Sequence, residues 1–139
     1  MSRALVRSVL LAATGLGATL GVSLPVAHAE PTCSVTTHDD TFVEHVVASM
    51  TGKRCGEAAE IARTCALGAS GDSAIAGAAV KLCKPDFASR KADAALFATL
   101  SKRCASKYAK QQGTLYVSAA AFCQLDVATL LSDLDSPVQ

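Results

Sequence analysis

The sequence predicts an all-α fold, a small disulfide-stapled bundle of four to five helices. Apolar residues recur at helical spacing over most of the chain, and only Leu115-Tyr116-Val117 alternates as a strand would. Glycines and one proline divide these stretches into segments of helical length. The third observation is an even number of cysteines, all beyond residue 29: Cys33, Cys55, Cys65, Cys83, Cys104 and Cys123.

The first 29 residues have the pattern of a cleaved secretory signal peptide. Arg3 and Arg7 give it a positive start, residues 8–26 carry no charge, and Ala27-His28-Ala29 supplies the small-x-small cleavage site. We therefore expect an exported protein, secreted or periplasmic, that consists of a single helical domain over residues 30–139.

An uncleaved membrane anchor is the alternative interpretation of this leader, because its uncharged run approaches the ~20 residues that a bilayer span requires. Pro25 and the Ala-x-Ala site favour cleavage. We expect no stable membrane anchor after cleavage, and a frayed C-terminal tail from about residue 135.

The charge balance of residues 30–139 excludes some classes of partner. These residues hold 11 of the 13 Lys and Arg and all 12 Asp and Glu, a formal charge of −1. Such a balance gives no general attraction to nucleic acid or to anionic membranes, so no nucleic-acid partner is expected. The domain has no Trp and much Ala, and the small apolar area per residue suggests that cross-links supply part of its stability.

The first two helices follow from caps and apolar spacing. Thr41 and Glu44 have the spacing of a capping box, and they predict a helix over residues 41–51 that ends at Gly52. A second helix presents Ala58, Ile61, Ala62 and Cys65 on one face, and it ends before residues 68–71, Gly-Ala-Ser-Gly.

Three further helices are expected. The third begins at Asp72 or Ser73, is built largely from small residues, and ends before Pro85. The fourth runs from Phe87 to Gln112, with Asp93 interrupting its apolar stripe. Ser118 is expected to cap the fifth, whose broad apolar surface indicates a central position.

The cysteine pairing can be narrowed by helix geometry, although six cysteines allow fifteen connectivities. In an antiparallel hairpin, residues equally far from the turn come level with one another. This predicts the pairs Cys33–Cys65, Cys55–Cys83 and Cys104–Cys123. A structural zinc site is disfavoured because no two cysteines have the close C-x2-C spacing that such sites use. No cofactor is expected.

One cluster of titratable residues includes histidine: His38, Asp39, Asp40, Glu44 and His45. His38-Asp39 resembles the His-Asp pair of secreted phospholipases A2, but the adjacent cysteines that bracket that family's motif are missing, so the activity is not carried over. Acidic residues that stabilise the start of a helix are the alternative interpretation, and we favour it.

Basic residues form a second candidate surface on the expected fourth helix: Lys91, Lys102, Arg103, Lys107 and Lys110. They could bind an anionic partner, although a solvated helix surface is the commoner explanation. Together the two clusters give a speculative surface site that contains His38, Asp39, Lys102 and Arg103, and we predict no catalytic or metal-binding residue.

In general character the chain resembles elicitins, small exported helical proteins with three disulfides and a sterol-holding cavity. Six cysteines and few large aromatic residues are shared, but the cysteine spacings differ. Three functions therefore stay open. The first is a non-enzymatic binding protein, inhibitor-like, that presents a helix face to a protein partner. The second is a carrier of a lipid or small apolar ligand, for which the small residues of the third helix could leave a cavity. The third is a hydrolase that uses His38 and Asp39.

Overall fold

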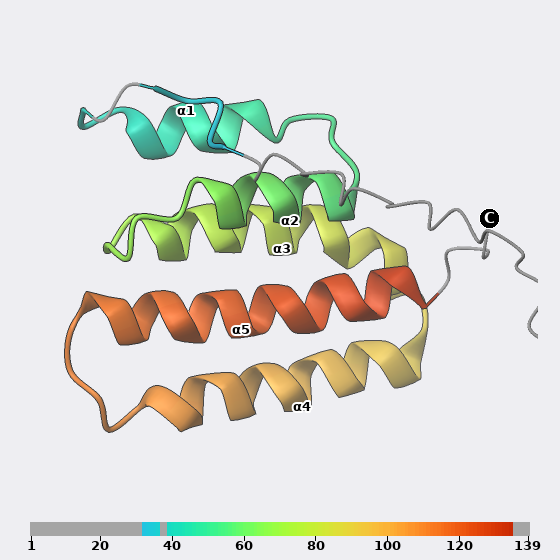
Figure 1. The fold of residues 1–139 in the computed structure, drawn as a ribbon. Helices are drawn as coiled ribbons and strands as arrows, with labels where there is room; N and C mark the ends of the chain where they lie inside the picture. The colour runs from blue at the N-terminus through green and yellow to red at the C-terminus, as the bar shows by residue number, and fades with distance from the viewer. Residues whose placement is uncertain (1–31, 37–38, 135–139) are drawn as a thin grey trace, which may run out of the picture.

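The computed structural model describes residues 32–36 and 39–134, which form five α-helices and, within these ranges, no strand. The expected signal peptide, His38 and the C-terminal tail lie outside the described residues. The all-α, disulfide-stapled fold predicted from the sequence is confirmed (Figure 1). The helices are α1 (Phe42–Ser49), α2 (Cys55–Thr64), α3 (Asp72–Ala88), α4 (Lys91–Tyr108) and α5 (Thr114–Asp133).

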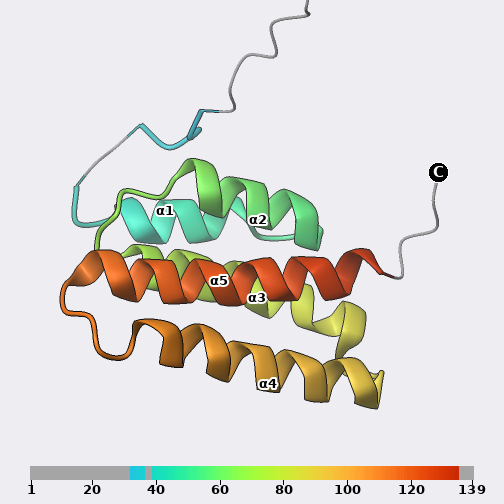
Figure 2. The ribbon, with the colours of Figure 1, turned by 60° about the horizontal axis from the view of Figure 1, so that its bottom comes forward.

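Successive helices run up and down the bundle, and α3 and α5 lie side by side near its centre (Figures 1 and 2). α3 contacts every other helix, whereas α4 lies at the edge and packs mainly against α5. Cys104 is the one buried residue of α4. The expectation of a central fifth helix is met in part, because α5 packs on α2, α3 and α4 but leaves Leu115, Val117 and Leu130 exposed.

Small side chains allow α2 and α3 to approach closely. Ala58, Ala59 and Ala62 of α2 and Ala76 and Ala79 of α3 are fully buried. Because these residues add little apolar area, the larger side chains between them provide most of the hydrophobic stabilisation. The largest fully buried apolar side chains are Phe87, Met50, Ile75, Leu125, Leu131 and Val46.

The start of α1 differs from the expected capping box. Thr41 makes no capping hydrogen bond with its side chain. Instead, the carboxylate of Asp39 accepts hydrogen bonds from the Thr41 amide at 2.9 Å and from the Thr41 hydroxyl at 2.5 Å. Asp39 is the residue that organises the turn, because a short carboxylate can reach the amide two positions ahead.

Pro85 lies inside α3, so the prediction that the third helix ends before it is wrong. The proline removes one backbone hydrogen bond and would be costly in an isolated helix. Two tertiary contacts hold the helix on either side of it. Cys83 is bound to Cys55, and Phe87 is 1% exposed with its ring 5.2 Å from that of Phe97. Phe87 therefore belongs to α3, and the predicted start of the fourth helix there is also wrong.

The backbone breaks between α3 and α4 at Arg90, which is extended (φ −87°, ψ 100°). Its guanidinium holds the junction: one nitrogen donates to the Asp86 carbonyl at 2.8 Å, a second donates to the Leu131 carbonyl at 2.8 Å, and Nε pairs with Asp93. Asp93, which interrupts the apolar stripe, is thus the ion-pair partner of Arg90.

Ser118 does not cap the fifth helix, which begins four residues earlier, after Gly113. Gly113 has a φ of 108°, a left-handed conformation that favours glycine. Ser118 is instead buried within α5, where its hydroxyl lies 2.9 Å from the Ala69 carbonyl. In the sequence Ser118 resembles a cap, because serine is a common N-cap residue and a run of helix-forming apolar residues follows it.

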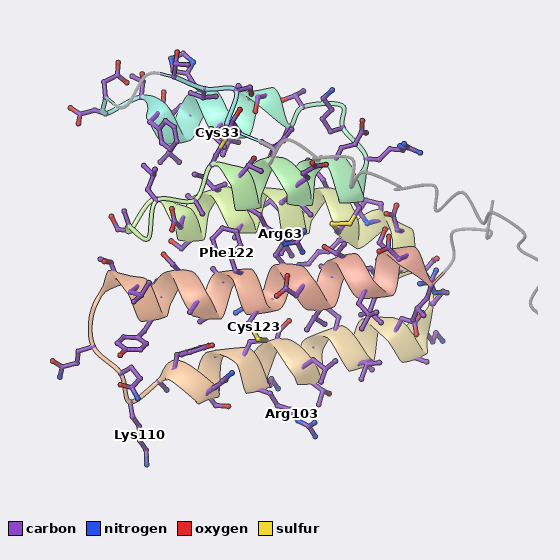
Figure 3. The ribbon with its side chains drawn as sticks, viewed as in Figure 1. Cys33, Arg63, Arg103, Lys110, Phe122 and Cys123 are labelled. Carbon is purple, nitrogen blue, oxygen red and sulfur yellow. A yellow bond between two sulfur atoms is a disulfide. The ribbon has the colours of Figure 1, made fainter. Side chains whose placement is uncertain are left out.

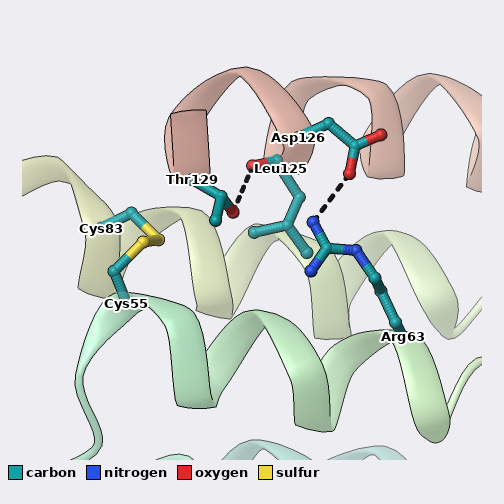
Figure 4. A network of polar contacts seen from close by, with 6 residues as sticks. All are labelled: Cys55, Arg63, Cys83, Leu125, Asp126 and Thr129. Carbon is teal, nitrogen blue, oxygen red and sulfur yellow. Dashed lines mark hydrogen bonds and ion pairs between the residues drawn. A yellow bond between two sulfur atoms is a disulfide. The ribbon is translucent and has the colours of Figure 1, made fainter. Parts of the chain in front are cut away.

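Three disulfides connect the chain in the pairs that the hairpin argument predicts. Cys33 of the N-terminal segment is bound to Cys65 after α2, Cys55 of α2 to Cys83 of α3, and Cys104 of α4 to Cys123 of α5. Three intramolecular disulfides are typical of proteins from oxidising compartments. Figure 4 shows the Cys55–Cys83 bridge near the exposed ion pair of Arg63 with Asp126, whose nitrogen and oxygen lie 2.8 Å apart.

Candidate functional site

The acidic cluster at the start of α1 has a structural role in the described residues. Hydrogen bonds from Thr41, first from its hydroxyl and then from its amide, hold the pKa of Asp39 below its ordinary value. Asp40, Glu44 and His45 are exposed. Both hydrogen bonds to the Asp39 carboxylate come from Thr41, in the turn that starts the helix. The pairing of Asp39 with His38, on which the hydrolase hypothesis depends, lies outside the described residues and stays a prediction.

The basic residues of α4 are exposed. Lys102 and Arg103 lie on its solvent side, and Arg103 and Lys110 point away from the bundle in Figure 3. Lys107 lies over the ring of Tyr108, with its ammonium 5.2 Å from the ring centroid. The structure does not bring Asp39 together with Lys102 or Arg103, because α1 and α4 lie on opposite sides of the bundle (Figure 1). The speculative site is therefore two separate surfaces.

A groove of about 520 Å³ lies between α3, α4 and α5, towards the end of the bundle that holds Gly113. Hereafter we call it the α3–α5 groove. Its volume falls in the range of small-molecule sites. Helix α3 contributes Ser73, Gly77 and Val80; α4 and the following loop contribute Ala105, Tyr108, Ala109 and Gln111; α5 contributes Tyr116, Val117, Ala120, Ala121 and Gln124.

The groove exists because α3 and α4 meet at one end of the bundle only. At the Arg90 junction, Phe87 of α3 packs on Phe97 of α4. At the opposite end, Tyr108 of α4 packs on Tyr116 of α5, with ring centroids 6.4 Å apart. Small residues leave the space between these two aromatic pairs unfilled, and a Cβ atom added at Gly77 would meet no atom within 4 Å.

The chemical character of the groove is that of a binding site for apolar molecules. Alanines and Val80 line its walls, the two tyrosines stand at one end, and Gln111 and Gln124 supply amide groups. Asp, Glu, His and Cys do not appear among the lining residues, so the groove lacks the side chains that most often act as general acids, bases or nucleophiles. The hydroxyl groups of Ser73, Tyr108 and Tyr116 are the lining side chains with a proton to donate, and the rest of the arrangement is suited to binding and shielding a ligand.

Within residues 32–36 and 39–134, no three His, Cys, Asp or Glu side chains gather closely enough to hold a metal ion. Helix α5 is long and apolar enough to cross a membrane by length and composition alone. The central helix of a bundle meets the same criteria, and α5 packs on three other helices.

Comparisons with protein-family models, with curated proteins and with solved structures find no similar protein. The resemblance to elicitins therefore rests on general character alone.

The sequence contained one signal for this site. The small residues of the third helix, among them Gly77, suggested a cavity, and Gly77 does line the groove. The contributions of α4 and α5 were not foreseen. Ala105 and Ala120 look like ordinary helix residues in the sequence, and the groove depends on the splay between α3 and α4, which local spacing does not encode.

Proposed function

We propose that this protein is an exported binding protein that performs no chemistry and carries a small apolar ligand in the α3–α5 groove. The observation that supports the proposal is the groove itself, a space of about 520 Å³ lined by small apolar residues and two tyrosines. A cross-linked bundle suits this role, since a rigid site loses less conformational entropy when it binds. The disulfides and the signal-like leader support export.

Extraction of the ligand tests the proposal. The oxidised protein is purified from its native source without detergent, extracted with organic solvent, and the extract analysed by mass spectrometry. We expect the extract to contain a small apolar compound in about the same molar amount as the protein.

Two variants of α4, each an alanine replaced by leucine, compare a position in the groove with a position outside it. Ala105→Leu places a larger side chain in the groove and should abolish ligand recovery, whereas Ala92→Leu adds the same volume at an exposed position outside it. Equal recovery from both variants, or an extract without ligand from the unaltered protein, would exclude a carrier that uses this groove.

A second candidate function is recognition of an acidic protein by α4. It is favoured by the exposure of Lys102, Arg103, Lys107 and Lys110, which form no ion pair within the described ranges. Surface charges of this kind chiefly raise association rates. Affinity capture with the unaltered protein should recover one partner, and a Lys102→Glu, Arg103→Glu variant should lose it.

A further inference from the structure

We infer that the ligand of the α3–α5 groove is a single-chain amphiphile with an anionic headgroup, such as a medium-chain carboxylate, and that its headgroup lies at the Phe97 end of the groove. This inference rests on the proposed function and names the chemical class of the ligand. It depends on two lysines, on two polar groups without partners, and on the absence of acidic residues from the groove lining.

Lysines continue the groove-lining face of α3. Lys81 and Lys84 follow Gly77 and Val80 by one helical turn each, so they lie on the same face of the helix. The ammonium of Lys84 lies 5.8 Å from the centroid of the Phe97 ring on α4. It thus reaches from α3 to α4 where these two helices come together, which places a positive charge at the closed end of the groove.

Two uncharged polar groups lack partners at the same end. Ser101 precedes Ala105 by one turn on the inner side of α4, and its hydroxyl is buried without a hydrogen-bond partner in the described chain. Gln124 lines the groove from α5, and its amide makes no hydrogen bond to residues 32–36 or 39–134. Buried polar groups normally have partners, so the unpaired Ser101 hydroxyl, one turn beyond Ala105, leaves hydrogen-bonding capacity that a ligand headgroup at this end would use.

The charges around the groove are complementary to an anion. No acidic residue lines it. The nearby acidic residues of α3 and α4 are already engaged, since Asp86 binds Ser132 and Asp93 binds Arg90. Neither Lys81 nor Lys84 forms an ion pair with any residue the structure describes.

The apolar part of the groove fits an extended chain. From Tyr116 to Gln124, α5 rises about 12 Å, and the two ends differ in character. Tyr108 and Tyr116 line one end, where Lys107 is held over the Tyr108 ring. At the other end, Lys81 and Lys84 lie one helical turn beyond the lining residues, on the side of the unpaired Ser101 hydroxyl. A molecule that satisfies both ends has an apolar tail and a charged head.

The test compares two probes that differ in the headgroup alone. Oxidised protein labelled with ¹⁵N is titrated with decanoate and with decanol, each as monomer, and the affinities are measured from amide chemical shifts. We expect decanoate to bind about tenfold more tightly, the effect of one charge-assisted hydrogen bond. The Lys81→Gln, Lys84→Gln variant should lose this preference and keep its affinity for decanol.

A matched variant controls for net charge. Lys107→Gln, Lys110→Gln removes the same charge at the tyrosine end, and it should keep the preference for decanoate. Equal binding of both probes by the unaltered protein would overturn the anionic headgroup but leave the carrier function intact. If both double variants lost the preference for decanoate equally, the preference would come from the net charge of the protein, and this result would also overturn the inference. Failure of both probes to bind would contradict the proposed function as well.

Discussion

The hydroxyl of Ser118 on α5 lies 3.0 Å from Oδ2 of Asp72 on α3, and this contact joins the first residue of α3 to the N-terminal part of α5. Asp72 is 2% exposed. Its carboxylate also accepts hydrogen bonds from the backbone amides of Leu67, Gly68 and Ala69, at 3.0, 2.8 and 3.2 Å. One buried carboxylate therefore fixes the α2–α3 loop, the start of α3 and the position of α5.

We predict that Asp72→Asn lowers the free energy of unfolding by about 2–3 kcal/mol, because an amide offers one acceptor oxygen and turns an N–H donor towards backbone donors. Ser118→Ala should cost about 1 kcal/mol, since the hydroxyl has one proton to donate and shares it between the Ala69 carbonyl and the Asp72 carboxylate. Urea unfolding of the oxidised protein measures both changes. Asp133→Asn, at an exposed position of α5, is the control and should change stability by less than about 0.5 kcal/mol. If Asp72→Asn and the control were equally stable, Asp72 would not organise the loop.

The hydrogen bonds around Asp72 show which features the sequence predicts and which it does not. The residue type of Asp72 and the glycines before it are local signals, and they predict a helix start there. Its contact with Ser118 joins residues 46 positions apart, and no local pattern reports it. The prediction that Ser118 caps the fifth helix is wrong for this reason.

The errors in helix ends have the same origin. A proline inside a helical stretch usually marks the end of the helix. In α3, however, the Cys55–Cys83 disulfide and the burial of Phe87 keep the chain helical beyond Pro85. The disulfide pairs were predictable because antiparallel hairpins relate cysteines through the intervening turn. The groove was predictable only from the α3 side, since its depth depends on where α4 leaves α3.

Removal of the Cys104–Cys123 disulfide should loosen α4 selectively. Cys104 is the one buried residue of this helix, so the bridge to α5 supplies much of its attachment. For the Cys104→Ser, Cys123→Ser variant we expect a loss of about 3 kcal/mol in the loop-entropy model. Amide hydrogen exchange should accelerate in α4 more than in α2 or α3.

The Cys33→Ser, Cys65→Ser variant is the control for this experiment. It releases the N-terminal segment and should leave exchange in α4 unchanged. Uniform acceleration across all helices in the Cys104→Ser, Cys123→Ser variant would show instead that the bundle unfolds as one unit.

Two glycine substitutions should change stability in opposite directions. A Cβ atom at Gly71 would lie 2.6 Å from Cγ2 of Val43, so Gly71→Ala should push α1 away and cost about 1–3 kcal/mol. At Gly77 the added methyl group meets nothing within 4 Å, and alanine favours the helix by about 1 kcal/mol. Thermal unfolding of the two variants compares them directly. A stabilising Gly71→Ala would mean that α1 does not pack closely on the α2–α3 loop.

The stability of α2 should depend on pH through Glu57. Its carboxylate accepts a hydrogen bond from the Arg54 amide at 3.1 Å, and this bond is the first cause that holds its pKa below the ordinary 4.5. A carboxyl group with a lower pKa in the folded state stabilises the fold above its unfolded-state pKa, and this contribution disappears as the pH falls through the folded-state pKa. Glu57→Gln cannot ionise, so the unaltered protein should have the higher melting temperature at neutral pH, and the difference should shrink once the pH falls below the pKa of Glu57. Melting curves across this range measure the difference, and NMR titration of the Glu57 carboxyl locates the transition. A difference that stayed constant with pH would show that the hydrogen bond contributes equally in both protonation states.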